Sequence, residues 1–345
     1  MDAHARRLCT APMMDWSDRH CRYFFRQLAP RALVYTEMIT TGALIHGNVA
    51  RHLRFHRAEH PIALQLGGSD PAELAYCARL GEQWGYDEIN LNCGCPSERV
   101  QHGAFGACLM AEPKLVANCI KAMQDAVCIP VTVKHRLGID HTEDYDFARR
   151  FVDALATAGC RTFIMHARNA MLKGLSPKGN REVPPLRYAD VYRLKRDFPE
   201  LTIVINGGIG SWAQIEQHLA RVDGVMLGRA AYHDPYLLAL ADGHLHGQSR
   251  APTRAEVVNA MYEYAKEELL QGISLRAIAR HMLGLFHGQP RARLWRQMLC
   301  DAPQLGRNEP GLLLDALQAT GADSPQTAMS PVSPLLCADA QSADS

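Results

Sequence analysis

The chain has 345 residues, of which 47% are hydrophobic and 21% are charged, a balance typical of globular proteins that excludes a wholly disordered chain. Lysine and arginine number 37 and aspartate and glutamate 36, so the formal net charge is +1 and gives no overall sign of a polyanionic partner. No apolar run reaches the ~18–20 residues of a membrane span, and the first residues lack the apolar stretch of a signal peptide.

The eleven cysteines contain no C-x-x-C pair, which argues against both a zinc ribbon and a disulfide framework. We therefore expect a cytoplasmic protein that binds no metal and does not enter a membrane.

Eight short apolar runs recur in the first 245 residues, separated by stretches with helical signals. The runs are almost continuously hydrophobic, which is typical of strands buried on both faces. Asp70, followed by Pro71 and Glu73, is one such helix signal, an N-cap candidate ahead of a first-turn proline and an early acid. Eight alternating units predict an α/β fold, a (β/α)8 TIM barrel over residues 1–245, with a doubly wound open sheet as the alternative. The predicted strands are 8–11, 32–39, 62–66, 88–92, 130–134, 162–166, 202–206 and 224–228.

After residue 251 the strand-like runs stop. Helical spacing over 255–271, 274–286, 291–300 and 311–319 predicts a compact helical domain at 251–320. The last stretch, 322–345, is rich in serine and proline and has no lysine or arginine, so we expect a disordered tail there.

Polar residues stand where the predicted strands end, which in a barrel is the catalytic rim. Gly207 and Gly208 follow the seventh strand, and Gly228 and Arg229 follow the eighth. Glycines admit close backbone approach and arginine offers a fork of donors, so these two loops predict a phosphate site. The other polar strand ends are Gln65, Asn92, Lys134 and His166.

Two thiols lie in the turn after the fourth strand, in the run Asn92-Cys93-Gly94-Cys95-Pro96. Taken alone, this segment favours a tight turn holding two buried cysteines over a reactive centre.

The run from Asn90 to Ala107 resembles the signature of the tRNA-dihydrouridine synthases, flavin enzymes that reduce uracil rings in transfer RNA. The first loop, from Ala11 to Trp16, and the motifs around Lys134, His166, Asn206 and Gly228 match that family in order and spacing, over about residues 8–320. Finer matches at 174–181 and 284–290 resemble the A subfamily, which modifies positions 20 and 20a. Cys93 departs from the family, where an aliphatic residue is common.

The resemblance implies FMN at the rim, NADPH or NADH as electron donor, and tRNA as substrate, with no protein partner. It implies that a hydride reaches C6 of uracil and that Cys95 gives a proton to C5. An ordinary thiol, with a pKa of about 8.5, is mostly protonated at neutral pH and suits that task. The flavin ring contacts carried over from the family are Pro12, Met13, Met14, Gln65 and Lys134. The ribityl and phosphate contacts are His166, Asn206, Gly207, Gly208, Gly228 and Arg229.

A folded RNA also needs a basic surface outside the flavin site. Residues 171–196 hold seven basic side chains against two acidic ones, and residues 273–300 hold five arginines and no acid. The near-zero net charge therefore conceals two basic strips on an otherwise acidic chain. The candidates for tRNA contact are Lys178, Arg181, Arg293 and Arg296, with Asn92 nearer the base.

Three other interpretations remain open from the sequence. An FMN barrel of the dihydroorotate or dihydropyrimidine dehydrogenase type would share the phosphate loops and Lys134 but act on small molecules. A lyase would form a Schiff base on Lys134. A non-catalytic tRNA-binding protein would need only the basic strips.

Overall fold

Eight parallel strands form a closed barrel in the computed structural model, which describes residues 6–97, 103, 105–142, 144–247 and 250–322. The strands neighbour one another in chain order, and β1 also pairs with β8. The last seam, between β1 and β2, is closed by a bridge at Cys9 and Leu33, where the Leu33 N–H donates to the Leu8 carbonyl at 3.0 Å. The predicted (β/α)8 barrel is therefore confirmed. The strands are β1 (Leu8–Thr10), β2 (Val34–Thr40), β3 (Ile62–Gly67), β4 (Glu88–Cys93), β5 (Val131–Ile139), β6 (Thr162–Ala170), β7 (Thr202–Asn206) and β8 (Gly224–Leu227).

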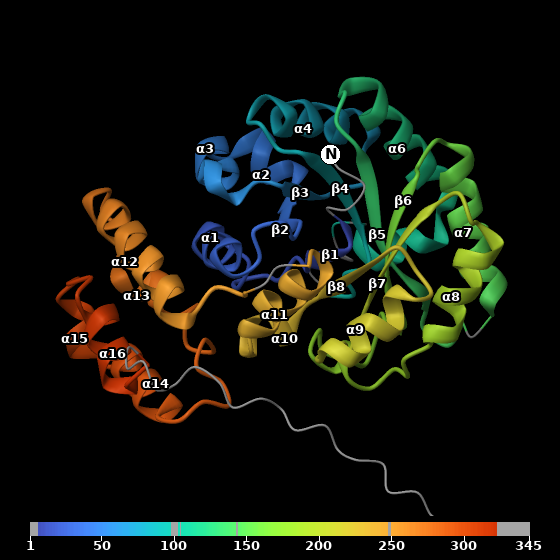
Figure 1. Ribbon diagram of the computed structural model, residues 1–345. Coiled ribbons are helices and arrows are strands. Elements are labelled where there is room, and N and C mark those ends of the chain that lie inside the picture. The colour runs from blue at the N-terminus through green and yellow to red at the C-terminus, as the bar shows by residue number, and fades with distance from the viewer. Residues whose placement is uncertain (1–5, 98–102, 104, 143, 248–249, 323–345) are drawn as a thin grey trace, which may run out of the picture.

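Helices surround the barrel on the outside (Figure 1). The predicted start at Asp70 is confirmed, because its carboxylate accepts the N–H groups of Ala72 and Glu73 at 2.9 Å each, ahead of a helix that opens with Pro71. The α-helices are α1 (Arg19–Leu28), α2 (Thr41–His46), α3 (Val49–Leu53), α4 (Pro71–Gln83), α6 (Pro113–Ala126), α7 (Tyr145–Thr157), α8 (Tyr188–Asp197), α9 (Trp212–Leu219), α10 (Arg229–His233) and α11 (Tyr236–Leu245). Short 3-10 helices are η2 (Arg57–Glu59), η3 (Gly106–Ala111) and η4 (Gly179–Arg181).

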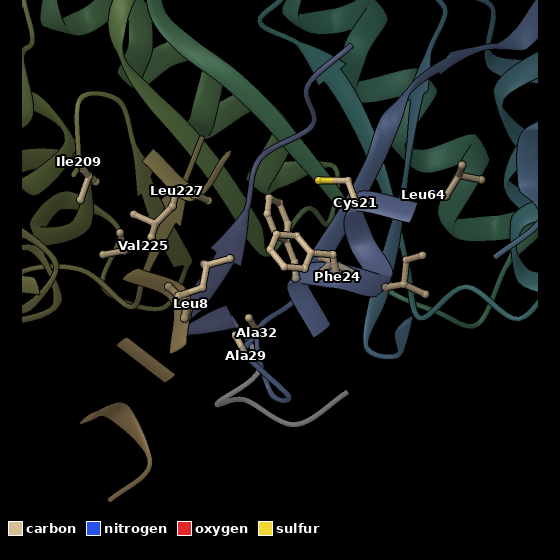
Figure 2. Close-up of a cluster of buried hydrophobic side chains, with 14 of the residues drawn as sticks. Leu8, Cys21, Phe24, Ala29, Ala32, Leu64, Ile209, Val225 and Leu227 are labelled. Atoms are coloured by element: carbon tan, nitrogen blue, oxygen red, sulfur yellow. The ribbon is translucent and has the colours of Figure 1, made fainter. Parts of the chain in front are cut away.

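Strand alternation divides the core into two layers. Outward-facing side chains pack against the helices, and Figure 2 shows Leu8 of β1 and Val225 and Leu227 of β8 in this layer, with Phe24 of α1. A smaller cluster draws on the strands and their flanking residues alone and fills the barrel interior: Cys9, Ala11, Leu33, Tyr35, Ala63, Ile164, Val204 and Met226. Strands β4 and β5 add nothing to this interior cluster. The inward positions of β4 and β5 are polar instead, which places a run of hydrogen-bonding groups on that side of the barrel.

Of the C-terminal helices, α12 (Arg254–Leu270) and α13 (Leu275–Ala279) contact α1 (Figure 1), and the group shares the outer hydrophobic core with the barrel. The other helices of the group are α14 (Ala292–Cys300), α15 (Ala302–Gly306) and α16 (Leu312–Thr320). The helix predicted at 274–286 is wrong in its second half, because α13 ends at Ala279 and turns follow. At Gly284 the backbone passes so close to the His233 carbonyl that an added Cβ would lie 2.6 Å from that oxygen. Contact with α10 therefore determines the path of this segment.

Polar and aromatic contacts join these helices to α1. His20 Nδ1 lies 2.8 Å from the Tyr264 hydroxyl, and the Tyr23 and Tyr264 rings stack with centroids 3.9 Å apart. An ion pair links Arg19 to Glu268 at 2.5 Å.

In the part of the chain that the structure describes, no helix is long and apolar enough to cross a membrane. Apart from Ala322, the predicted tail lies outside the described residues.

Candidate active site

Lys134 and His166 lie inside β5 and β6 and not at the predicted strand ends. Both strands continue beyond them, past a shift in register, as a paired extension in which Gly138 faces Asn169. The predicted strands end at the first charged or imidazole side chain, whereas the outward positions that follow, such as Leu137 and Ala167, are fully buried against the outer layer. The inward positions two residues on from Lys134 and His166 are Arg136 and Arg168, which the sequence analysis missed.

The two thiols after β4 have different surroundings. Cys93 is the last residue of the strand, is fully buried, and packs in the outer layer with Ile89 and Leu91. Burial raises the pKa of Cys93 well above its usual value. Cys95 lies beyond the strand, is partly exposed, and has its Sγ 3.7 Å from the Ser97 hydroxyl. Only Cys95 is therefore accessible from the rim.

The Asn92 side chain forms the turn that carries Cys95. Its Oδ1 accepts the backbone N–H groups of Gly94 at 3.1 Å and Cys95 at 2.9 Å, while its Nδ2 donates to Gln65 Oε1 at 2.8 Å. Asn92 is buried, unlike the other four predicted tRNA contacts. It therefore lies directly beneath Cys95, and its amide already has three partners.

Cationic side chains crowd the rim around Cys95. Burial, and next the charge of Arg136, lower the pKa of Lys134 from 10.5 to about 7. Burial, followed by the charges of Arg136 and Lys134, holds the pKa of His166 well below its usual value. Burial also lowers the pKa of Arg136 to about 10, and its Nε donates to the Gly94 carbonyl at 2.9 Å. A site with this excess of positive charge suits an anionic ligand.

Arg181 and Arg229 extend this cationic cluster. Partial desolvation lowers the pKa of Arg181, and the neighbouring charge of Arg229 lowers it further. The acid facing them is Glu182, which accepts from Arg229 Nη1 at 2.5 Å. No local sequence pattern predicts that Glu182 lies at the site, because its partner is 47 residues away. Arg168 lies beside the same group, and burial and Arg229 lower its pKa as well.

The loop after β7 has the backbone geometry expected of a phosphate cradle. Gly207 and Gly208 have φ angles of 118° and 69°, in the region that favours glycine. A Cβ at Gly207 would lie 2.6 Å from His166 Cδ2, so only glycine lets this loop approach the imidazole so closely. Asn206 is buried and its Nδ2 donates to the Met226 carbonyl at 2.8 Å, which holds the loop against β8. Beside it, an added Cβ at Gly228 would make only an ordinary van der Waals contact, with Ala11 Cβ at 3.7 Å.

The first loop covers the barrel interior. Met13 packs against the interior cluster, its N–H donates to the Ser17 hydroxyl at 2.9 Å, and that hydroxyl donates back to the Met13 carbonyl at 3.2 Å. Pro12 is half-buried and Met14 is 57% exposed. The structure thus places an apolar loop beside the cationic rim, an arrangement that fits a flat aromatic ring with a phosphate tail.

Two cavities adjoin the rim, and their charges differ. One, of about 370 Å³, lies between the barrel and the C-terminal helices and is lined by Tyr232, His233, Arg280, Leu283, Gly284 and Arg296. The other, of about 530 Å³, lies near the ends of β2 and β3 and carries Asp70 and Glu73. A polyanion is compatible with the first cavity and not with the second. Lys178, Arg181, Arg293 and Arg296 are all exposed, the first two at η4 and the last two on α14.

Comparison with known proteins decides the family. The model of the dihydrouridine synthase (Dus) family matches residues 9–320. The chain belongs to this family. A tRNA-dihydrouridine(20/20a) synthase of Synechocystis is 58% identical, covering 92% of this chain and 96% of its own length. The proteins of the same name from Salmonella typhi and Pseudomonas aeruginosa are 55% and 56% identical, covering 91% and 86% of this chain and 95% and 90% of their own lengths.

Among solved structures, a 2-naphthoyl-CoA reductase in complex with 2-naphthoyl-CoA matches with a TM-score of 0.52 at 11% identity, covering 70% of this chain and 50% of that one. This likeness supports the fold alone.

Proposed function

We propose that this dihydrouridine synthase reduces the C5=C6 bond of uridine at positions 20 and 20a of the tRNA D-loop. The observation that carries the proposal is the partly exposed thiol of Cys95, held on the Asn92 turn among cationic side chains and beside a glycine cradle. The names and identities of the relatives support the same substrate.

The residues at the rim fit FMN. The cradle of Gly207, Gly208 and Gly228 with Arg229 would hold the phosphate, and His166 and Asn206 the ribityl chain. Pro12, Met13 and Met14 would line the ring, and Gln65 and Lys134 would bond its polar edge. When bound, FMN reduced by NADPH or NADH supplies the hydride that uracil C6 receives. Arg168, inward-facing like His166, is a further phosphate ligand in this proposal.

Cys95 would act as the proton donor to uracil C5. Its loss of a proton leaves a thiolate, and Lys134, Arg136 and Arg181 each interact electrostatically with this cysteine. Those cations stabilise the negative charge that the transfer leaves behind. Asn92 would place the thiol, and its second amide hydrogen would be directed toward the base.

The helical domain at 251–320 would bind the tRNA together with the barrel rim. Arg293 and Arg296 are three residues apart on α14 and exposed, and Arg296 also lines the cavity next to α10. Lys178 and Arg181 would contact the same RNA from the barrel side. Because the proposed substrate is tRNA, we propose that the protein acts in the cytoplasm. We propose no protein partner.

The proposal is tested with an unmodified tRNA transcript, FMN and NADPH. The purified protein should be yellow, and mass spectrometry of nuclease fragments should find dihydrouridine at positions 20 and 20a. The proposal fails if flavin is bound and reduced but the added hydrogens appear elsewhere in the tRNA or not at all.

A further inference from the structure

A chain of hydrogen-bonded side chains runs through the barrel interior to the Cys95 turn. Strand β4 contributes Glu88, Asn90 and Asn92, which are alternate residues and face the interior together. All three are buried. The chain runs from Glu88 through Thr132 of β5 to Asn90, then through Gln65 of β3 to Asn92.

Glu88 fixes the direction of the first bonds. Arg6 donates to Glu88 Oε2 from Nε at 3.0 Å and from Nη2 at 2.6 Å, so the carboxylate is paired with a guanidinium group. An ionised carboxylate can only accept, so the Thr132 hydroxyl must donate to Glu88 Oε1, at 2.6 Å, as the Tyr35 hydroxyl does at 2.7 Å. The Thr132 oxygen is then an acceptor for Asn90 Nδ2, at 2.8 Å.

Each following amide has its orientation set by the one before it. Because Asn90 turns its NH₂ group to Thr132, its oxygen faces Gln65 Nε2 at 2.7 Å. Gln65 Oε1 must then face Asn92 Nδ2 at 2.8 Å, and Asn92 Oδ1 faces the Cys95 N–H at 2.9 Å. Reversing one amide would bring two oxygens or two NH₂ groups together, which costs a buried hydrogen bond on each side.

We propose that Glu88 and Thr132 are positioning residues that set the amide orientation of Gln65 and Asn92 and thereby the turn that carries Cys95. The inference rests on the proposed function for Cys95. Neither Glu88 nor Thr132 lies at the rim. Packing alone does not require polar side chains at these positions, because apolar groups fill the other side of the same interior: Ile164, Val204 and Met226. The polar chain lies under the Cys95 turn only.

Thr132 offers a matched pair of variants. Thr132→Val keeps the branched shape and removes the hydroxyl, whereas Thr132→Ser keeps the hydroxyl and removes a methyl group. With FMN and NADPH present, we expect Thr132→Val to lower kcat for dihydrouridine formation about tenfold with KM for tRNA changed less than about twofold, the scale of a misplaced catalytic group. Thr132→Ser should recover kcat to within about threefold. Equal losses in the two variants, or no loss in Thr132→Val, would overturn the proposal.

A second measurement does not depend on activity. In flavin-free protein, alkylation by iodoacetamide is followed separately at Cys95 and Cys93 by mass spectrometry over a range of pH. Thr132→Val should change the Cys95 rate at least about threefold, by releasing its turn, while buried Cys93 stays protected; Thr132→Ser should match the native protein. A parallel rise at both cysteines means general loosening and overturns the proposal, as does no change at Cys95. If the native protein makes no dihydrouridine, the proposed function fails, and this alkylation test still decides whether the chain positions Cys95.

Glu88→Gln extends the test. A glutamine can donate as well as accept, so the direction of the chain is no longer imposed, but the half-buried Arg6 loses its charged partner. A folded Glu88→Gln protein should show the Cys95 behaviour of Thr132→Val, and native behaviour in that folded protein would contradict the role of Glu88.

Discussion

The side-chain oxygen of Asn92 accepts the backbone N–H of Cys95 at 2.9 Å, so the last inward-facing residue of β4 holds the residue that we propose as the acid. This bond gives the two cysteines of the motif different surroundings. Cys93 belongs to the strand and packs outward, whereas Cys95 belongs to the turn that Asn92 shapes.

Replacing each thiol in turn tests this separation. Cys95→Ala should retain flavin binding and reduction by NADPH but lose at least about a hundredfold in dihydrouridine formation, the usual scale for a missing general acid. Cys93→Ala should keep its activity and lose about 1–2 kcal/mol of stability through the small cavity it leaves. Quantification of dihydrouridine and denaturant unfolding measure both effects. A Cys95→Ala protein that modifies tRNA at the native rate would remove the assignment.

Gly207 and Gly210 form a second matched pair. Gly207→Ala would put a Cβ 2.6 Å from His166 Cδ2 on a backbone with φ of 118°. We expect a loss of about 1–3 kcal/mol and reduced flavin occupancy, measured by thermal unfolding and by flavin absorbance. At Gly210 the nearest contact to an added Cβ is Ala230 Cβ at 3.9 Å, so Gly210→Ala should stay within about 0.5 kcal/mol of the native protein. Similar effects at both positions would contradict the cradle.

Lys134 predicts a pH dependence of stability. Its pKa falls from 10.5 to about 7 on folding, so between those values the unfolded chain binds more protons and stability rises with pH. In flavin-free protein, the stability advantage of Lys134→Met over the native protein should therefore be largest near pH 6. That advantage should shrink by about 2–3 kcal/mol by about pH 9. Urea unfolding at both values measures it, and Lys114→Met, at an exposed site on α6, should show no such trend. A stability advantage that grows with pH would contradict the buried cation.

The same Lys134→Met variant should bind FMN about tenfold more weakly, through loss of a charged hydrogen bond.

The two arginines of α14 predict salt-dependent RNA affinity. The double variant Arg293→Ala/Arg296→Ala should weaken tRNA binding and reduce the slope of log Kd against log salt by about 1 for each lost phosphate contact. Flavin reduction by NADPH should not change. Arg161→Ala, at an exposed arginine that precedes β6 and so lies at the opposite end of the barrel, is the control and should leave the slope intact. An equal slope in the double variant and the native protein would exclude α14 from the interface.

The sequence alone was enough to predict the barrel, the two glycine loops and the family. Almost continuous apolar runs with polar residues after them are local features, and all eight predicted strands occur. The assumption that a strand ends at its first polar residue placed the ends of β5 and β6 too early, at Lys134 and His166. Arg136 and Arg168 were therefore not predicted. Their positions depend on pairing between strands that extends beyond the first polar residue.

Only the tertiary structure decided which thiol is accessible from the rim and what holds it. Cys93 and Cys95 are two residues apart, and their separation depends on where β4 ends and on the Asn92 turn. The bond from Thr132 to Glu88 joins residues 44 apart in the chain. Hydrophobic periodicity is set by neighbours in sequence, whereas the partners of a buried polar group are set by the closed barrel, which brings β3, β4 and β5 together.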